Sequence, residues 1–249
     1  MTPAPVHAHL HQSLLLRLLA EQGMVDTAVA IGDVAPRLGD WLDFRQAISL
    51  HGVLNPQAPV EQAAHTQGTA VLSAEALTRH VDKVRLQLVQ SISQGAPTGS
   101  GLTRIDMPPA ELDEPPDPKT AYEPYRRFYA AHQRQMETVI RSLRSQVRGQ
   151  LGKSSSALQQ LATLDAAFEN ILSEREAVLL GKVSKLLEKR FAQAIKQHLK
   201  KQADGATPVQ PLAWLMPLRQ GLRSALLAEL DTRLQPTLGL LDAFNAENP

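Results

Sequence analysis

Two rows of basic side chains have the type and spacing to bind phosphate groups. At about 100° per residue, a helix over 125–151 gathers its arginines within an arc of about 100°, and the next helix gathers five lysines within about 60°. The candidate DNA-binding residues are Arg126, Arg127, Arg134, Arg141, Arg144, Arg148, Lys182, Lys185, Lys189, Lys196 and Lys200. Each neutralised phosphate releases counterions, and arginine can hold a phosphate through two parallel hydrogen bonds. The rows therefore predict sequence-independent binding to DNA.

The alternative reading is a solvated outer face, since any amphipathic helix carries charge on one side. Residues 124–203 contain 15 basic and only 6 acidic residues. A solvated helix face normally carries glutamates that form ion pairs with basic residues at i,i+4. The excess of basic over acidic residues therefore favours an anionic ligand, and the solvated face stays the alternative.

Other residues that could take part in catalysis or metal binding lack the partners that this chemistry needs. The GKS sequence at 152–154 follows a predicted helix, and Val147 stands where a phosphate-binding loop requires glycine. His7, His9 and His11 alternate, but no carboxylate or cysteine complements them as metal ligands, and the chain has no cysteine. We therefore predict no catalytic residues, no metal site and no cofactor, and a protein that is not an enzyme. A nuclease subunit whose site is completed by a partner stays open.

Proline divides the chain into segments that can and cannot be helical. Residues 96–124 contain seven prolines, whereas none lies between Pro124 and Pro208. Because proline in a helix interior costs about 3 kcal/mol, we predict an acidic, disordered Pro-rich linker over 96–123. Leucine and alanine are abundant and aromatic residues make up 4%, which favours helix.

The predicted fold is all-α, with three parts. A small N-terminal helical domain (1–95) has helices over 7–22, 36–54 and about 73–93. After the linker, residues 124–249 form a long antiparallel helical hairpin and a C-terminal helix. The hairpin helices cover 125–151 and about 156–203, with a break expected at Gly181, and the last helix covers 217–234.

Net charge is distributed unevenly among these parts. The whole chain carries +1, but the segments 1–95, 96–123, 124–203 and 204–249 carry −2, −4, +9 and −2. The acidic residues of 106–123 could fold back on the arginine row and compete with DNA, or the linker could be only a spacer. No segment is apolar enough to span a membrane, and the first 23 residues do not resemble a secretory signal, so we expect a cytoplasmic protein with no direct membrane insertion.

Six stretches of the sequence resemble a proteobacterial family classed as a domain of unknown function. They are LLLRLLAEQGMVD near the start, WLDFRQAISLHGVLN at 41–55, YRRFYAAHQRQMETVIRSLR at 125–144, LQQLATLDAAFENILSEREAVLL at 158–180, LLEKRF at 186–191 and LLAELDTRLQPTLGLLDAF at 226–244. The resemblance implies genes that lie beside those for a MotA/TolQ-like proton-channel protein and an OmpA-like peptidoglycan-binding protein, as in a Zorya-type anti-phage system. The family provides no catalytic residues that could be carried over.

The resemblance and the charge pattern together suggest a function. We expect a non-catalytic cytosolic effector or adaptor of a motor-linked defence system that assembles with a second soluble subunit of the same operon and binds DNA through the hairpin. The membrane proton-channel complex is a further expected partner. The alternative is a structural regulator or scaffold of that complex that does not bind nucleic acid.

Overall fold

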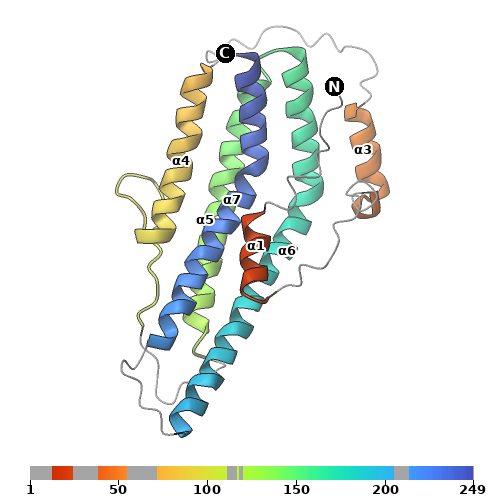
Figure 1. The fold of residues 1–249 in the computed structure, drawn as a ribbon. Coiled ribbons are helices and arrows are strands. Elements are labelled where there is room, and N and C mark those ends of the chain that lie inside the picture. The colour runs from red at the N-terminus through yellow and green to blue at the C-terminus, as the bar shows by residue number, and fades with distance from the viewer. Residues whose placement is uncertain are drawn as a thin grey trace, which may run out of the picture. The chain divides into compact units, whose positions relative to one another are not determined.

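The protein is helical throughout the part that the structure, a computed structural model, describes. That part comprises residues 13–24, 39–54, 72–110, 117, 120–204 and 213–248, and it contains no strand. In chain order the elements are α1 (Leu14–Glu21), α3 (Phe44–Leu54), α4 (Ala74–Gln94), α5 (Glu123–Leu151), α6 (Ser156–Ala203), the 3-10 turn η3 (Ala213–Leu215) and α7 (Met216–Glu247) (Figure 1). The predicted all-α class is confirmed.

Helices α5 and α6 form the predicted long hairpin. The turn between them ends at Ser155, whose hydroxyl accepts a hydrogen bond from the Leu158 amide at 3.2 Å and so caps α6. Tyr122, just before α5, contacts Ser184 of α6, and Gln133, further along α5, contacts Leu180, which comes earlier in α6. The two helices are therefore antiparallel.

The break predicted at Gly181 is wrong, because α6 is continuous over 48 residues. Glycine inside a helix costs only about 1 kcal/mol relative to alanine. Leu180 and Val183 on either side are 7% and 4% exposed, so burial of these side chains offsets that cost.

The helix predicted over 36–54 is interrupted at residues 42–43. Residues 36–38 lie outside the described part, a helical turn covers 39–41, and α3 begins at Phe44. The cause is a reciprocal cap: the Asp43 carboxylate accepts from the Gln46 amide at 2.7 Å, and the Gln46 side chain accepts from the Asp43 amide at 3.0 Å. These bonds satisfy amides that begin a new helix.

The other predicted helices occur with shifted ends. In α1, which Ser13 caps, residues 14–21 of the predicted 7–22 are helical, and 7–12 lie outside the described part. Ser73 caps α4 as expected, accepting from the Ala76 amide at 3.2 Å. The last helix runs past its predicted end and contains Pro236. Buried leucines on both sides of this proline, Leu234 and Leu240, hold the helix together there.

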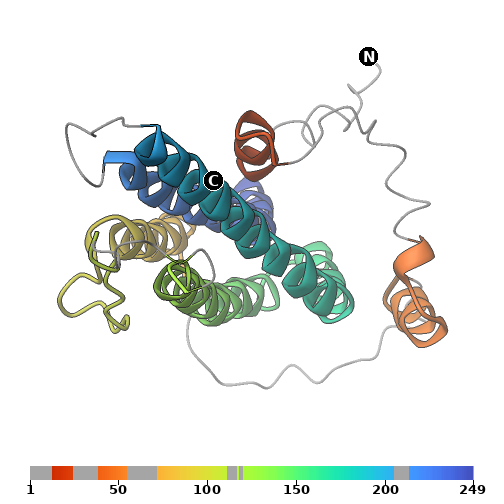
Figure 2. The same cartoon turned by 90° about the horizontal axis from the view of Figure 1, so that it is seen from below.

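Contacts between Cα atoms group the chain into two compact units. Unit 1 comprises 1–28, 85–139 and 178–233, and unit 2 comprises 29–84, 140–177 and 234–249. The division into 1–95, 96–123 and 124–249 as domains stays a prediction. In unit 1 the second half of α6 and the first half of α7 run side by side (Figures 1 and 2). Phe191 and Trp214 contact each other there, with ring centroids 6.2 Å apart.

Each unit has its own apolar core. The largest buried side chains of unit 1 are Leu88, Tyr122, Tyr125, Tyr129, Met136, Phe191, Ile195 and Leu215. Those of unit 2 are Leu77, Leu143, Leu151 and Phe244. The apolar faces of the long amphipathic helices thus supply both cores.

Residues 97–110 of the predicted linker are irregular, as their prolines require, and they make specific contacts within unit 1. The Thr103 amide donates to the Gln135 side chain at 2.9 Å, and the carbonyl of Pro109 accepts from the Tyr125 hydroxyl at 3.2 Å. Arg219 donates to the Pro108 carbonyl at 2.6 Å. Residues 97–110 are therefore held in place, although we expected disorder over 96–123. Residues 111–116 and 118–119 lie outside the described part.

Candidate nucleic-acid interface

The second half of α6 presents one face of exposed lysines, all of them in unit 1. This lysine face consists of Lys182, Lys185, Lys189, Lys196 and Lys200. The opposite side of the helix is buried, with Phe191 and Ile195 exposed by 1% and 0%. The predicted division of this helix into a basic and an apolar side is therefore confirmed.

Contacts on the buried side fix the rotation of α6 and so determine which way the lysines point. The Tyr122 hydroxyl donates to the Ser184 carbonyl at 3.3 Å, and the ring of Phe191 packs against those of Tyr122 and Tyr125 with centroids 5.3 Å away. Burial raises the pKa of Tyr122 to about 12, so its hydroxyl stays protonated and continues to donate at neutral pH. A rotation of α6 about its axis would break these contacts.

A buried polar node in unit 1 joins α6 to α5 and α7. The side chain of Gln133 donates to the Leu180 carbonyl at 3.3 Å and to the fully buried Glu229 carboxylate at 3.0 Å. Glu229 also accepts from the Tyr129 hydroxyl at 2.8 Å and pairs with Arg233 at 2.9 Å. Because the carboxylate has three partners, its burial is compensated, and the node positions the helix that carries the lysines.

Within the part of the chain that the structure describes, no acidic side chain neutralises the charges of the lysine face. Residues 182–201 contain six lysines, Arg190 and a single acidic residue, Glu188. None of the five lysines of the face makes an ion pair with any residue that the structure describes. An uncompensated row of this kind favours anions at its surface.

The arginine row of α5 is different, because acidic side chains neutralise much of it. Arg126 and Arg127 are exposed but both pair with Glu123, one turn away. Arg141 is exposed and has an interaction partner. Arg134 is exposed, and within the described ranges it forms no ion pair. Of these four arginines, Arg134 has the charge most available to a ligand.

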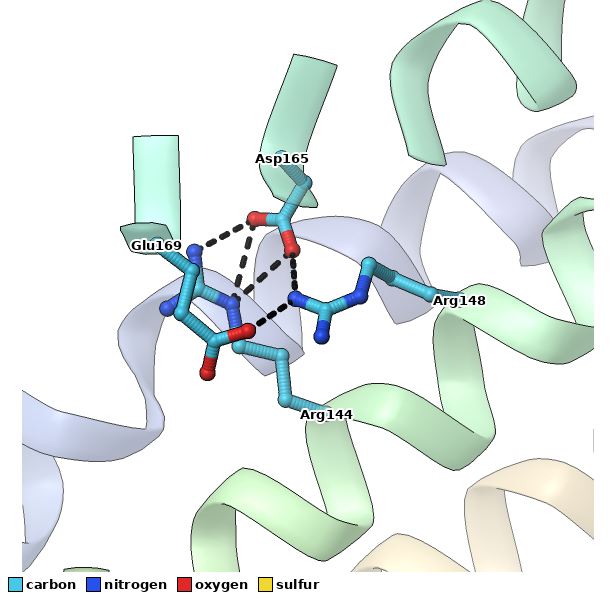
Figure 3. Close-up of polar contacts among 4 residues, drawn as sticks. All are labelled: Arg144, Arg148, Asp165 and Glu169. Carbon is cyan, nitrogen blue, oxygen red and sulfur yellow. Dashed lines mark hydrogen bonds and ion pairs between the residues drawn. The ribbon is translucent and has the colours of Figure 1, made fainter. Parts of the chain in front are cut away.

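Arg144 and Arg148 lie in an ion-pair cluster with two acidic residues of α6, within unit 2 (Figure 3). Arg144 contacts both carboxylate oxygens of Asp165, at 2.6 and 2.9 Å, and Arg148 contacts Asp165 at 2.8 Å and Glu169 at 2.5 Å. The four side chains are only 11–17% exposed. Both arginines belong to the row that the sequence predicts to bind DNA, but these carboxylates occupy their guanidinium groups.

The electrostatics of Arg148 show how well this cluster is compensated. Burial alone would lower the pKa of this guanidinium, but the hydrogen bonds and charges of Asp165 and Glu169 outweigh burial and raise the pKa. Arg148 is therefore held in its charged form by the protein itself, and binding to a phosphate would require breaking these bonds.

Sequence reasoning missed Asp165 and Glu169, although a signal for them exists. Arg144 and Arg148 are four residues apart on one helix, and Asp165 and Glu169 are four residues apart on the next. A hairpin that turns at 152–155 places Arg144 opposite about residue 163, so Asp165 is within one turn of it. Counting back from the turn would have paired the two helices and removed both arginines from the row.

A surface groove of about 390 Å³ lies beside Arg134, between α5 and the irregular segment 101–105. Its lining includes Leu102 and Ile105 on one side and Val139 on the other. Gln135 holds the segment in position, since it accepts from the Thr103 amide and donates to Ser91. The nearby acid of the linker, Asp106, pairs with Arg104 and not with the arginine row.

Among the described residues, no group of three or more His, Asp or Glu side chains is arranged to hold a metal ion. In the same part of the chain, no helix combines the length and apolar character needed to cross a bilayer.

Comparison with protein-family models identifies one family across almost the whole chain. Residues 1–246 match the family described as "Protein of unknown function (DUF3348)". The chain belongs to this family. Neither the curated proteins nor the solved structures include a match to this DUF3348 protein.

Proposed function

We propose that this DUF3348 protein binds the backbone of nucleic acid, without reading sequence, through the lysine face of α6. One observation carries the proposal: five exposed lysines follow one side of the helix, unpaired within the described part, while the opposite side is buried. Phosphate contacts of this kind position a protein on DNA but give no base specificity. Arg134 is the arginine best placed to add to them.

We propose that in the cell this protein is a non-catalytic, cytosolic effector or adaptor of a proton-motor-linked, Zorya-type anti-phage system, and that it uses this binding in that role. The support is the resemblance of the six sequence stretches to a family encoded beside proton-channel and OmpA-like proteins. The proposed partners are a second soluble subunit of the same operon and the membrane proton-channel complex.

A binding assay at several salt concentrations tests the molecular part. If five lysines each neutralise one phosphate of duplex DNA, log affinity falls against log salt with a slope of about −4.5. Between about 50 and 200 mM salt, the affinity for a labelled duplex should then drop by about 500-fold. A flat salt response would refute phosphate binding.

Two variants with the same change of net charge separate a specific face from general positive charge. The first is Lys185→Gln/Lys189→Gln/Lys196→Gln, which removes three charges from the lysine face. The control, Arg17→Gln/Arg45→Gln/Lys83→Gln, removes three exposed charges from α1, α3 and α4. We expect the first to weaken binding at about 100 mM salt by at least about 100-fold and the control to change it little. Equal effects would refute the lysine face as the binding surface.

Affinity purification from phage-infected cells tests the cellular part. Recovery of DNA together with a soluble partner is expected. Recovery of the proton-channel protein without DNA, combined with no duplex binding in vitro, would favour the scaffold function instead.

A further inference from the structure

The lysine face lacks the ring surfaces with which proteins hold unpaired bases. In unit 1 the rings of Tyr122, Tyr125, Tyr129, Phe128 and Phe191 are at most 4% exposed. The remaining aromatic side chain of the unit, Trp214, is half-buried. One ring face of Trp214 stacks on His198 with centroids 4.9 Å apart, and Phe191 lies against it as well.

These six residues are all the Phe, Tyr and Trp residues in the three segments of unit 1. Proteins that bind single strands combine a basic groove with exposed aromatic rings, and each stacked base contributes about 1–3 kcal/mol. The lysine face can offer charge to a single strand, but unit 1 has no fully exposed aromatic ring on which a base could stack.

The length of the lysine face determines how many phosphates of a straight DNA ligand lie along it. From Lys182 to Lys200 the helix rises through 18 residues, or about 27 Å at 1.5 Å per residue. Duplex DNA carries one charge per about 1.7 Å of axis, so about 16 phosphates lie along that length, against about 8 for one strand. A straight row of cations therefore meets twice the charge when the ligand is double-stranded.

A membrane surface fits the same face poorly. Helices that bind anionic membranes insert an apolar side between the lipids. The apolar side of this part of α6, with Leu187, Phe191 and Ile195, is buried within unit 1. Only the charged side is available to a ligand.

From these observations we propose that the lysine face binds duplex nucleic acid in preference to single strands and to anionic membranes. This inference rests on the proposed function. Five neutralised phosphates give a log–log salt slope of about −4.5 for a duplex and about −3.5 for a single strand. At about 100 mM salt, that difference alone corresponds to an approximately tenfold preference for the duplex.

The test measures fluorescence anisotropy of a labelled 30-base-pair duplex and of each of its separated strands with the full chain, at 50, 100 and 200 mM salt. We expect the duplex to bind about tenfold more tightly at 100 mM and with the steeper slope. Equal or tighter binding of the single strands, lost in the lysine-face variant, would overturn the duplex preference while leaving the proposed function intact. Absence of binding to every DNA form at 50 mM would instead overturn the proposed function.

An added aromatic residue provides a second, independent test. Gln193 is exposed and lies between Lys189 and Lys196 along the helix, at the edge of the lysine face. Gln193→Trp should raise single-strand affinity at least about fivefold and leave duplex affinity nearly unchanged, because it supplies the missing stacking surface. The matched control is Gln193→Leu, which should leave both unchanged. An unaltered single-strand affinity in Gln193→Trp would show that missing ring surfaces do not set the preference. Tighter binding to vesicles of phosphatidylglycerol than to the duplex would overturn the proposal in favour of a membrane.

Discussion

The ion-pair cluster of Arg144, Arg148, Asp165 and Glu169 leads to a quantitative prediction about stability. The substitution Asp165→Leu removes the carboxylate that contacts both arginines and leaves Arg144 without its counter-charge. Removing one member of a buried pair costs about 3–5 kcal/mol, because the remaining charge stays desolvated. Since these side chains keep 11–17% of their surface exposed, we expect a cost somewhat below that range, about 2–4 kcal/mol.

Urea unfolding of four proteins measures the effect: the wild type, Asp165→Leu, Arg144→Met and the double variant. Each single variant should lower the unfolding midpoint by about 0.7–2 M urea, given a slope of about 2–3 kcal/mol/M for a chain of this size. The double variant should be more stable than the sum of the single effects predicts, by about 1–3 kcal/mol, because it removes both charges together.

The refuting result for this cluster is a coupling below about 0.5 kcal/mol, or one that disappears in 1 M salt. Either would show that solvent screens these groups as it screens surface pairs. Arg144 and Arg148 would then be free to contact phosphate, as the sequence predicts for these two arginines.

Three other predictions concern stability. Burial lowers the pKa of His132 to about 4, whereas an unfolded histidine titrates near 6.5, so the unfolded state binds more protons between these values and stability falls as the pH drops through that window. From pH 7 to 5 the wild type should lose about 2 kcal/mol more than His132→Leu does in urea unfolding, and equal losses would contradict a neutral buried imidazole. Gly181→Ala should raise stability by about 0.5–1 kcal/mol, since nothing lies within 4 Å of the added carbon, and a lower melting temperature would mean that α6 is not a regular helix there. Glu229→Leu should destabilise by about 3–5 kcal/mol, because Arg233 is only 9% exposed and loses its counter-charge, and a double variant with Arg233→Met should recover part of the loss.

The long helices could be predicted from the sequence because their apolar residues recur at helical spacing for many turns. The helices predicted over 125–151 and about 156–203 agree with the bounds of α5 and α6 to within two residues. The interruption at 42–43 could not, because it depends on a reciprocal bond between Asp43 and Gln46 that competes with an otherwise regular apolar pattern. The unbroken course of α6 through Gly181 depends on packing, which a local propensity does not include.

The candidate site was predictable in the same partial way. The rotation of one helix determines that Lys185 and Lys189 share a face, so the lysine row followed from the sequence alone. Whether Arg144 and Arg148 are available depends on which residue of the neighbouring helix lies opposite, and that is a property of the hairpin register. Considering each helix by itself therefore overestimates the number of basic side chains that are available to a ligand.

The charges of α6 are sorted along its length as well as around it. Residues 156–177 carry Asp165, Glu169, Glu174 and Glu176 against Arg175, a net −3, whereas residues 182–201 carry +6. The two groups are centred about 20 residues apart, or about 30 Å along one continuous helix. Because Arg144 and Arg148 neutralise Asp165 and Glu169, the uncompensated charge of this helix lies at its lysine end, and that end attracts a polyanion before contact. Electrostatic steering raises association rates by about 10–10³-fold at low salt. We therefore expect α6 to set the rate at which the protein associates with a polyanion, and its lysine end to make the first contact.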